Sequence, residues 1–555
     1  MKIDGFCEDR LRGAGNFSNM VTSEDMQSSE NALCSSARTL SVAAVVASRR
    51  PPRWVGDALA RVDKLDGVHL EHVIVDPQTD EPRYAPGVPT ILKLYSYADS
   101  RAYPLPSSGL DERPLPEKLD RLVANDASQI TVDYMVDLRT NGDARRWAGH
   151  ARLGVLSPRN ELVQPAERNV LDAIRNLSPI ASNVELVDAT GARVVTETIG
   201  ACHVLSPGRT LETAYRRSEI LVPRALERLA GSRIGEMERS SESRVSLTAP
   251  PSLRSALAFL LSAVPRLAGR FCRHLVMKEE WYVAARVLPE GEEPLPWNLG
   301  SSRRFERVQA PRSVYLADPW LLERDGCTYV FVESFAHREG RGTIVVAPVD
   351  SHGRFADVRP ALQRPYHLSY PCIFEFEGEL FMIPESSANG TVDLYRSSAF
   401  PAGWDHVGVL LRDVLGADPT VLAHEGLLWL FVAIAGSGHL SADEELFLYF
   451  SERPEGPWTP HPLNPVVADV RCARPAGAIF EHAGKLVRPA QDCLRGYGHG
   501  ISIRSIDRIS RDAFEEHELG RITADQLEVD GTDVHTYTCA GQFEMIDVRR
   551  LRLRA

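Results

Sequence analysis

The C-terminal half of the chain repeats one arrangement of apolar and turn positions. In each copy a short apolar strand starts at a pivot residue, a glycine falls eight positions after the pivot, and a second apolar strand follows the glycine. Two apolar strands around a short glycine turn are typical of a β-hairpin. The pivots and their turn glycines are Asp318 with Gly326, Tyr370 with Gly378, Asp418 with Gly426, and Ala476 with Gly484.

The spacing of these hairpins indicates the architecture. The pivots lie 52, 48 and 58 residues apart, and a third apolar strand follows each hairpin. This period is typical of the four-stranded blades of a β-propeller. A fifth and weaker copy follows Asp533, where Gly541 again lies eight positions later. We therefore expect a five-bladed β-propeller over residues 301–555, with a β-sandwich built from hairpins as the alternative.

Residues 39–232 show a different pattern, in which apolar strands alternate with helical stretches. Strand patterns at Leu40–Ala47 and Val68–Val75 enclose a helical stretch, and further strands are expected at Ile130–Met135, Ala151–Leu156 and Val184–Val187. This alternation predicts an α/β domain with a parallel, Rossmann-like sheet. No Gly-x-Gly-x-x-Gly motif follows the first strand, so we expect no dinucleotide cofactor.

Two segments lie outside these domains. Residues 1–38 are rich in small and polar residues and lack an apolar core of signal-peptide length, so we expect a disordered tail and a cytoplasmic protein. Residues 233–300 form the expected linker, with an amphipathic helix near Leu253 that carries interspersed arginines. We expect its apolar face to pack on the protein itself, with contact to an anionic membrane surface as the alternative. No segment has eighteen uninterrupted apolar residues, so none is expected to span a membrane.

Composition narrows the classes of partner. The chain has 555 residues, 43% of them hydrophobic, which is enough for two domains with full cores. Its net charge of -12 argues against general binding of nucleic acid, because phosphate contacts need a basic surface. Nine cysteines without a Cys-x-x-Cys pair indicate reduced thiols and no structural zinc site. We expect no metal or cofactor, and a divalent cation shared by carboxylates is the alternative.

Propeller geometry makes the pivots candidate site residues, because the first residues of the innermost strands face the central channel. Fifteen residues after the pivots, the second strands carry Glu333, Glu385, Ala433 and Gln491. A carboxylate is costly to bury in an apolar core, so these positions are expected to face water, a cation or a ligand. The candidate catalytic carboxylates are Asp318, Asp418, Glu333 and Glu385.

Groups suited to hydroxyl-rich or anionic ligands surround these carboxylates. Arginine supplies planar pairs of donors, carboxylates accept from hydroxyls, and tyrosine can stack on the face of a sugar. The sequence therefore predicts a sugar or a sugar phosphate as the ligand. A structural ion pair between Arg488 and Asp492 is the alternative for those two residues. The expected binding residues are Tyr370, His367, Arg474, Arg488, Gln491, Asp492 and His535.

Five motifs in this half resemble a known family. They are Ala317-Asp-Pro319, Tyr366-His-Leu-Ser-Tyr-Pro371, Ile383-Pro-Glu385, Ala473-Arg-Pro-Ala-Gly477 and Arg488-Pro-Ala-Gln-Asp492. Together they resemble the N-terminal domain of plant glucosamine inositolphosphorylceramide transferase and its bacterial relatives. The resemblance implies a five-bladed propeller and adds a glycolipid head group to the expected ligands. In the plant protein the transfer chemistry is attributed to a separate C-terminal glycosyltransferase domain, for which this chain has no room, so a separate glycosyltransferase is an expected partner.

The implied fold is akin to that of arabinanase-like and invertase-like glycosidases, which place a base or nucleophile Asp on the first blade, an orienting Asp on the third and an acid Glu on the fourth. Asp318 and Asp418 match the first two by repeat position, whereas the fourth pivot is Ala476. Glycoside hydrolysis needs a proton donor as well as a carboxylate, so Glu333 or Glu385 would have to supply the proton.

We therefore expect a carbohydrate-active protein that performs glycosyl transfer or sugar modification in glycan, glycolipid or secondary-metabolite assembly. In that reaction Asp318 is the expected base or nucleophile and Asp418 the orienting charge, with Arg474, Arg488 and Gln491 clamping the substrate. The alternative from another class is a non-catalytic glycan-binding module that positions a separate transferase.

The α/β domain resembles the formyltransferase-type domain that accompanies bacterial relatives. Val132–Leu138 and Leu153–Ser157 fall where the active-site strands of that domain lie. Working formyltransferases use an Asn, a His followed by Pro-Ser, and an Asp; here Leu156-Ser-Pro158 replaces the His motif and no matching Asn precedes it. Formyl transfer needs a general base and an oxyanion stabiliser, so this domain is expected to be degenerate. N-formylation of an amino sugar is a further alternative.

Overall fold

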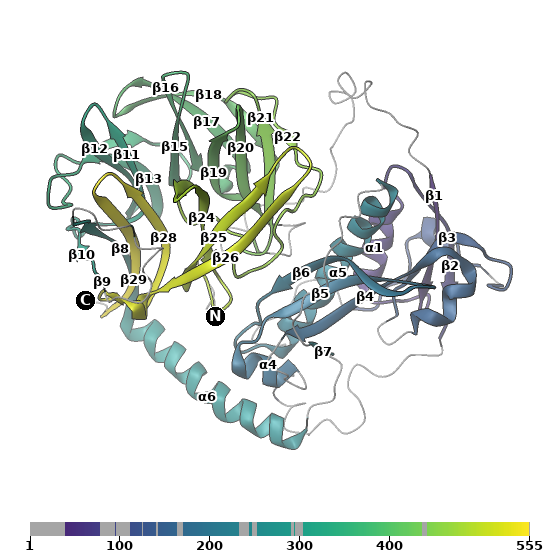
Figure 1. Ribbon diagram of the computed structural model, residues 1–555. Helices are drawn as coiled ribbons and strands as arrows, with labels where there is room; N and C mark the ends of the chain where they lie inside the picture. The colour runs from purple at the N-terminus through teal and green to yellow at the C-terminus, as the bar shows by residue number, and fades with distance from the viewer. Residues whose placement is uncertain are drawn as a thin grey trace. The chain divides into compact units, whose positions relative to one another are not determined.

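The structure is a computed structural model that describes residues 39–77, 95, 111–124, 126–139, 143–163, 170–231, 244–246, 252–289, 294, 303–435 and 441–553. The expected tail over residues 1–38 lies outside the described residues. The chain divides into two compact units, formed mainly by residues 1–264 and by residues 265–555. Figure 1 shows an α/β sheet in the first unit and a ring of small sheets in the second.

The first unit is built on a seven-stranded sheet in the order β2-β1-β3-β4-β5-β6, with β7 paired to β4. Strands β2, β1, β3 and β4 run parallel, whereas β5 and β6 are antiparallel to their neighbours. The wholly parallel, Rossmann-like sheet is therefore not confirmed, and only two residues separate β5 from β6, too few for a parallel crossover. The strands are β1 (Leu40–Val46), β2 (Val68–Val75), β3 (Val132–Asp137), β4 (Ala151–Val163), β5 (Ile180–Asp188), β6 (Gly191–Gly200) and β7 (Arg244–Ser246).

Both faces of this sheet are covered. Alternate side chains of β1 enter two different cores: Val42 and Ala44 pack with α1 and α5, whereas Ala43 and Val45 pack with Trp147 on the other face. A strand covered on both faces is apolar at every position, which is why β1 is the clearest strand signal in this half. The helices are α1 (Arg53–Val62), α3 (Glu117–Asp120), η1 (Ala144–His150), α4 (Val170–Asn176), α5 (Pro207–Ala230) and α6 (Leu253–Val276).

The second unit is a five-bladed β-propeller, which confirms the architecture that the hairpin repeat predicts. Each blade is a four-stranded antiparallel sheet. The first four blades are β11 (Val314–Arg324), β12 (Cys327–Ala336), β13 (Arg341–Pro348) and β14 (Arg359–Leu362); β15 (Ser369–Phe376), β16 (Glu379–Glu385), β17 (Thr391–Ala399) and β18 (Gly403–Arg412); β19 (Gly416–His424), β20 (Leu427–Ile434), β21 (Leu446–Ser451) and β22 (Thr459–Pro460); and β23 (Phe480–His482), β24 (Lys485–Asp492), β25 (Gly500–Ile509) and β26 (Phe514–Thr523).

The fifth blade is assembled from both ends of the unit. Its strands are β28 (Asp533–Ala540), β29 (Phe543–Leu553), β8 (Met277–Val287) and β10 (Glu306–Arg307), and nearby β9 (Arg303–Arg304) pairs with β27 (Leu527–Glu528). β8 pairs with β29 along its whole length, from Met277 opposite Leu553 to Val287 opposite Phe543. β8 falls within the linker expected over residues 233–300, because its partner strand lies far along the chain. In the structure β8 closes the ring, so the propeller begins before residue 301.

In four of the five blades the pivot lies at a break in the strand ladder, whereas Ala476 precedes the first strand of blade four, β23. The pairing of β11 with β12 skips Asp318 and Pro319, and the same two-residue break occurs at Tyr370, at Asp418 and at His535. The first three pivots have φ values of 51°, 44° and 49°, in the left-handed region that residues other than glycine rarely adopt. The eight-residue count back from Gly541 indicates Asp533 as the pivot of the fifth blade. The break in the ladder shows that the pivot is His535.

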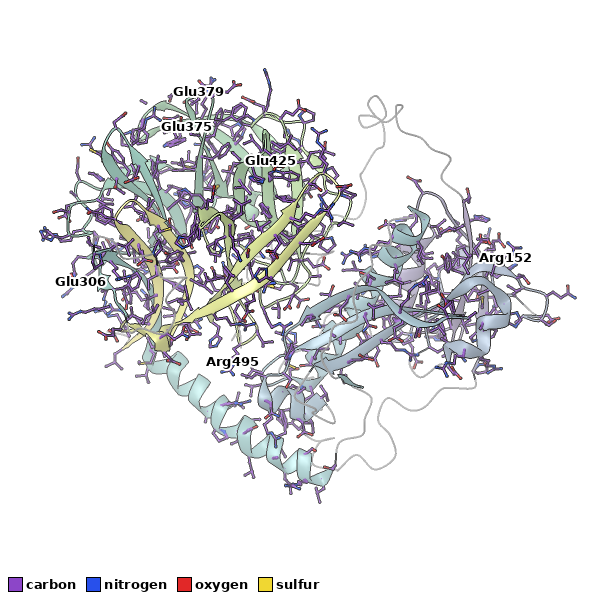
Figure 2. The ribbon with its side chains drawn as sticks, viewed as in Figure 1. Arg152, Glu306, Glu375, Glu379, Glu425 and Arg495 are labelled. Carbon is purple, nitrogen blue, oxygen red and sulfur yellow. The ribbon has the colours of Figure 1, made fainter. Side chains whose placement is uncertain are left out.

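The hairpin turns and the pivots lie at opposite ends of the inner strands. Figure 2 shows Glu375, Glu379 and Glu425 beside the hairpin turns, where they point into solvent. Arg495, in the connection after β24, lies at the other end of the propeller. The pivots therefore converge near the end that carries Arg495.

Candidate functional site

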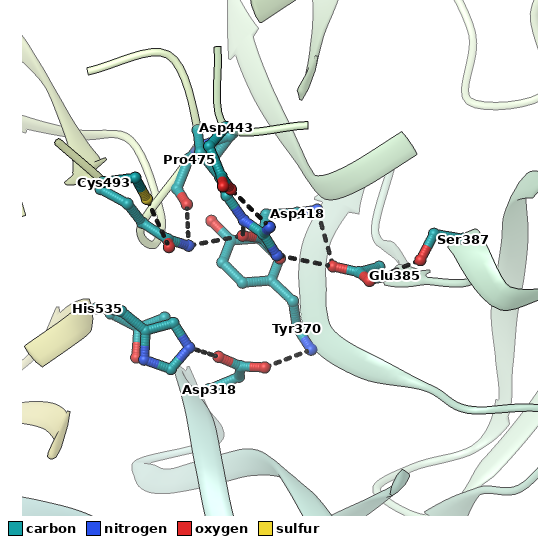
Figure 3. A network of polar contacts seen from close by, with 12 residues as sticks. Asp318, Tyr370, Glu385, Ser387, Asp418, Asp443, Pro475, Cys493 and His535 are labelled. Atoms are coloured by element: carbon teal, nitrogen blue, oxygen red, sulfur yellow. Dashed lines mark hydrogen bonds and ion pairs between the residues drawn. The ribbon is translucent and has the colours of Figure 1, made fainter. Parts of the chain in front are cut away.

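The first polar group at the axis joins blade one to blade five. Nε2 of His535 lies 3.0 Å from Oδ1 of Asp318, and its Nδ1 lies 2.8 Å from Oδ1 of Asp547. All three side chains are buried. Burial alone lowers the pKa of His535, but the two carboxylates raise it to about 10, so the ring holds a proton at neutral pH. The group is thus an imidazolium between two carboxylates, and Figure 3 shows its Asp318 side.

The second polar group joins blades two, three and four. Nε of Arg474 lies 2.6 Å from Oδ2 of Asp418, which also accepts from Nε2 of Gln491 at 2.7 Å. The other two guanidinium nitrogens reach Asp443 at 3.0 Å and Glu385 at 3.4 Å (Figure 3). Burial lowers the pKa of Arg474, but these acidic neighbours raise it well above its usual value. Arg474 therefore supplies a permanent positive charge among three carboxylates.

Backbone amides tie each of three pivots to a carboxylate of the preceding blade. The N–H of Asp318 donates to Asp547 at 3.0 Å, that of Tyr370 to Asp318 at 3.2 Å, and that of Asp418 to Glu385 at 3.4 Å. Charge-assisted bonds from backbone amides stabilise carboxylates that would otherwise be costly to bury. The axial carboxylates therefore hold neighbouring blades together in addition to any role toward a ligand.

Burial and mutual repulsion act on the two pivot carboxylates. Burial raises the pKa of Asp318, although His535 beside it acts in the opposite direction. Burial likewise raises the pKa of Asp418, and Arg474 only partly offsets this effect. The carboxylate of Glu385 adds to the rise in both cases, together with that of Asp547 for Asp318 and that of Asp318 for Asp418. Perturbed pKa values from burial and specific charged neighbours are typical of functional sites.

Tyr370 crosses the axis rather than offering its ring to a ligand. Its hydroxyl lies 2.9 Å from the hydroxyl of Thr420 and accepts from the N–H of Gly477 at 2.7 Å. The side chain is only 1% exposed. A Cβ on Gly477 would lie 1.9 Å from the carbonyl oxygen of Tyr537, so glycine is required at this point. The structure thus gives Tyr370, predicted as a sugar-binding residue, a contact that joins blades two, three and four.

Other residues expected at the site form separate ion pairs. His367 pairs with Glu333 at 3.4 Å and also accepts from the N–H of Gly342. Arg488 binds Glu516 at 2.7 Å, and Asp492 binds Arg521 at 2.5 Å. Arg488 and Asp492 therefore do not pair with each other, because each has a partner on β26. Of the expected residues, the structure brings together at the axis Asp318, Tyr370, Glu385, Asp418, Arg474, Gln491 and His535.

The hairpin repeat does not predict four residues of the site. Asp547 lies opposite the break in the fifth blade, and Asp443 lies in the connection before β21. Trp281 comes from β8, and Tyr497 from the connection between β24 and β25. Asp547 lies within the fifth hairpin but one position before Val548, which the fifteen-residue count from Asp533 indicates. The other three belong to connections or to a strand from the other end of the unit, which a count within hairpins does not find.

Two of these residues form an aromatic pair beside the polar groups. The ring of His535 lies 4.2 Å from that of Trp281 and 5.0 Å from that of Tyr497. The guanidinium of Arg474 lies 4.9 Å from the ring centroid of Tyr497. Trp281 and Tyr497 are half-buried, whereas the polar residues around them are buried. Partly exposed aromatic faces next to charged groups are suited to stacking on a sugar.

The first polar group also has the spacing of a metal site. One ligand atom from each of Asp318, His535 and Asp547 lies within 4.8 Å of the others. A metal ion needs an unprotonated imidazole nitrogen. Because the neighbouring carboxylates raise the pKa of His535 to about 10, a metal ion bound here would have to displace a proton from the ring.

Comparison with known proteins places the propeller near one family. The model of the family "Glucosamine inositolphosphorylceramide transferase 1, N-terminal" matches residues 305–545, in line with the resemblance of the five motifs. Glucosamine inositolphosphorylceramide transferase 1 of Arabidopsis thaliana is 34% identical over 214 residues, which are 37% of this chain and 27% of that protein. The enzyme of the same name from Oryza sativa subsp. japonica is 31% identical over 207 residues, 37% of this chain and 28% of that protein. The chain thus spans about a quarter of the length of these curated relatives.

Solved structures with low similarity include two glycoside hydrolases. A family 117 glycoside hydrolase of Zobellia galactanivorans has 12% identity and a TM-score of 0.33, with 49% of this chain and 90% of that chain covered. The catalytic domain of a GH62 alpha-L-arabinofuranosidase of Coprinopsis cinerea has 15% identity and a TM-score of 0.33, with 47% and 84% covered. Likeness at this level supports no conclusion about activity.

Proposed function

We propose that the propeller binds a sugar or glycolipid head group at its axis and performs glycosyl transfer or sugar modification there. The observation that carries the proposal is the Asp318–His535 contact at 3.0 Å beside the half-buried rings of Trp281 and Tyr497. A carboxylate, a protonated imidazole and two aromatic faces suit a ligand with hydroxyls and an apolar ring face. The match to the transferase family over residues 305–545 supports the same class of ligand.

In the proposed reaction Asp318 is the base or nucleophile. Its Oδ1 faces the imidazolium of His535, and its Oδ2 accepts from the amide of Tyr370. Movement of His535 away from Asp318 on ligand binding would leave the carboxylate to accept a proton from a sugar hydroxyl. Asp418 would act as a fixed charge that Arg474 and Gln491 orient.

Ordinary hydrolysis has less support than transfer. The fourth pivot, Ala476, cannot donate a proton, and it lies beside Arg474. Glu385 is engaged by Arg474 and accepts from the hydroxyl of Ser387 at 2.8 Å, while Glu333 pairs with His367. A leaving sugar oxygen needs an acid in reach, and neither glutamate is held as a ready donor.

A second candidate is a non-catalytic glycan-binding module that positions a separate transferase. It is favoured by the extent to which the axial carboxylates are already occupied: Asp418 by Arg474 and Gln491, and Asp318 by His535. Carboxylates held in this way can shape a binding site without taking part in chemistry. The two candidates differ only in turnover, which makes them separable.

We propose that the first unit has no formyl-transfer activity. Leu156 lies in the apolar core and Ser157 is 1% exposed, at the place where the formyltransferase resemblance expects a catalytic His motif. A buried leucine can supply neither the base nor the oxyanion contact that formylation needs.

The test combines binding with turnover. The purified chain is titrated with monosaccharides, inositol phosphates and nucleotide sugars, and its melting temperature is followed, since a ligand of the native state raises it. Asp318→Asn is measured beside Asp350→Asn, a change at a half-buried aspartate of blade one that pairs with Arg354. Turnover that Asp318→Asn abolishes while binding persists supports the enzyme. Binding by both variants without turnover under any donor supports the module, and a shift with a formyl-folate analogue alone contradicts both.

A further inference from the structure

Helix α6 carries an exposed apolar stripe. Among the described residues, it holds seven of the twelve large hydrophobic side chains that are exposed. Leu261 is 77% exposed and Val264 is 61% exposed, values that soluble surfaces rarely combine on one element. Five members of the stripe recur at spacings of three and four residues and so share one helical face: Leu253, Leu257, Leu261, Val264 and Leu267.

The adjacent side of the first half of α6 already has its own partner. Ala256, Phe259 and Ala263 are buried against a core that includes Leu171 and Ile174 of α4. The hydroxyl of Ser255 donates to Asp172 at 3.0 Å, which fixes the rotation of the helix. The apolar face expected to pack on the protein is therefore only partly used for packing, and the five residues of the stripe remain exposed beside the core that holds the helix.

The charge of α6 differs from that of the rest of the chain. Its 24 residues include Arg254, Arg266, Arg270 and Arg273 but no Asp or Glu, within a chain of net charge -12. An apolar stripe on a helix rich in arginine is typical of helices that lie in the plane of a membrane surface. Each basic residue near an anionic leaflet adds to its attraction. A second copy packed through this face would place two helices side by side that carry arginines but no acidic residue, so neither helix offers the other a charge partner.

We propose that α6 docks this protein on anionic lipid surfaces, with the stripe Leu253–Leu267 inserted into the head-group region. The helix would lie on the membrane, since no helix among the described residues is long and apolar enough to cross one. The stripe extends about 21 Å at 1.5 Å per residue, which is long enough for a stable interfacial contact. The proposal stands independently of the sugar site, although it would bring the propeller to the surface where lipid head groups are found.

Vesicle flotation of the full chain tests the proposal. The vesicles contain phosphatidylcholine alone or with 30% phosphatidylserine, and neither contains a glycolipid, so failure here is distinct from failure of the sugar site. We expect flotation with the anionic vesicles, little with the neutral ones, and a loss of at least about ten-fold in Leu257→Glu/Leu261→Glu. High salt should weaken the contact, because screening shortens the reach of the arginines.

The matched control places the same two charges on the propeller surface. Val407 and Leu519 are exposed strand residues, at 38% and 37%, and Val407→Glu/Leu519→Glu should float as the unchanged chain does. Circular dichroism of both variants checks that the fold is kept. Absence of flotation by the unchanged chain overturns the proposal, as does equal flotation of the two variants. A dimer in light scattering that only the α6 variant dissociates, without vesicle binding, would instead assign the stripe to a second copy.

Discussion

Blades one and three start from the same local design and reach different electrostatic outcomes. Both carry the sequence Ala-Asp-Pro, both skip two residues of the ladder at this point, and their aspartates have φ values of 51° and 49°. Asp318 nevertheless lies against His535, which can lose its proton within the experimental pH range, whereas Asp418 lies against Arg474, which cannot. Local sequence determines where each carboxylate lies, and side chains from other blades determine what it can do.

The largest expected effect comes from removing the permanent charge on the Asp418 side. Arg474→Ala leaves the carboxylates of Asp418, Glu385 and Asp443 buried without their shared cation. We expect a loss of about 3–5 kcal/mol in the free energy of unfolding, as for other broken buried ion pairs. Urea denaturation followed by tryptophan fluorescence measures it.

Two companion variants make this test specific. Arg474→Ala combined with Asp418→Asn should lose less than Arg474→Ala alone, because one uncompensated charge has been removed. Arg354→Ala breaks an exposed pair with Asp350 and should cost less than about 1 kcal/mol. An Arg474→Ala variant no less stable than Arg354→Ala would contradict the charge balance described for the axis.

The Asp318 side should respond to pH instead. Asp547 and Asp318 raise the pKa of His535 from 6.5 to about 10 in the folded chain. The folded state therefore binds this proton more tightly than the unfolded state, and the resulting stability is fully present below about pH 6.5 and disappears as the pH approaches 10. We expect the free energy of unfolding to fall over this range by up to about 5 kcal/mol.

Histidine variants identify the group that titrates. His535→Asn should flatten the pH dependence between 6.5 and 10, while His517→Asn, at an exposed histidine paired with Asp507, should leave it unchanged. Parallel curves for the unchanged chain and His535→Asn would show that another group titrates, and the contrast between the two blades would then lose its basis.

Tyr370 links the two sides, and its hydroxyl is expected to have a smaller effect. Tyr370→Phe leaves the buried N–H of Gly477 and the hydroxyl of Thr420 without their contact. We expect a cost of about 1–3 kcal/mol, the usual range for a buried donor left unpaired. Tyr366→Phe is the control, since that hydroxyl makes a longer contact of 3.4 Å with Asp393. Equal losses in the two variants would argue against a contact across the axis.

The repeat predicts much of this site because its positions are local. Counting from pivot to glycine finds Asp318, Tyr370 and Asp418, and counting on to the second strand finds Glu385 and Gln491. The count misplaces the fifth pivot by two residues, because the hairpin after His535 is shorter than the others. A pattern that depends on turn length cannot detect such a change.

The site residues that the repeat does not predict depend on contacts between distant parts of the chain. β8 completes the fifth blade by pairing with β29, so Trp281 reaches His535 across more than half of the propeller sequence. Arg488 illustrates the converse: its motif suggests a ligand contact, yet its charge is satisfied by Glu516 of the next-but-one strand. Burial, which separates these two cases, is a property of the packed blades and cannot be inferred from spacing.

The smallest expected effects come from substitutions of the aromatic pair, Trp281 and Tyr497. They show which side of the axis a ligand contacts. Trp281 contacts His535, whereas Tyr497 contacts both His535 and Arg474. For a sugar found in the binding screen, Trp281→Leu and Tyr497→Leu should each weaken binding by about 1 kcal/mol, or roughly five-fold, through loss of stacking. If Trp281 and Asp318 hold the same part of the ligand, Trp281→Leu should weaken binding little further when Asp318 is already changed to Asn. If the losses of affinity from the two substitutions add, the ring and the carboxylate contact independent parts of the ligand. Calorimetric titration of the unchanged chain, the three single variants and the double variant distinguishes these outcomes, and unchanged affinity in Trp281→Leu and Tyr497→Leu would remove the aromatic pair from the site.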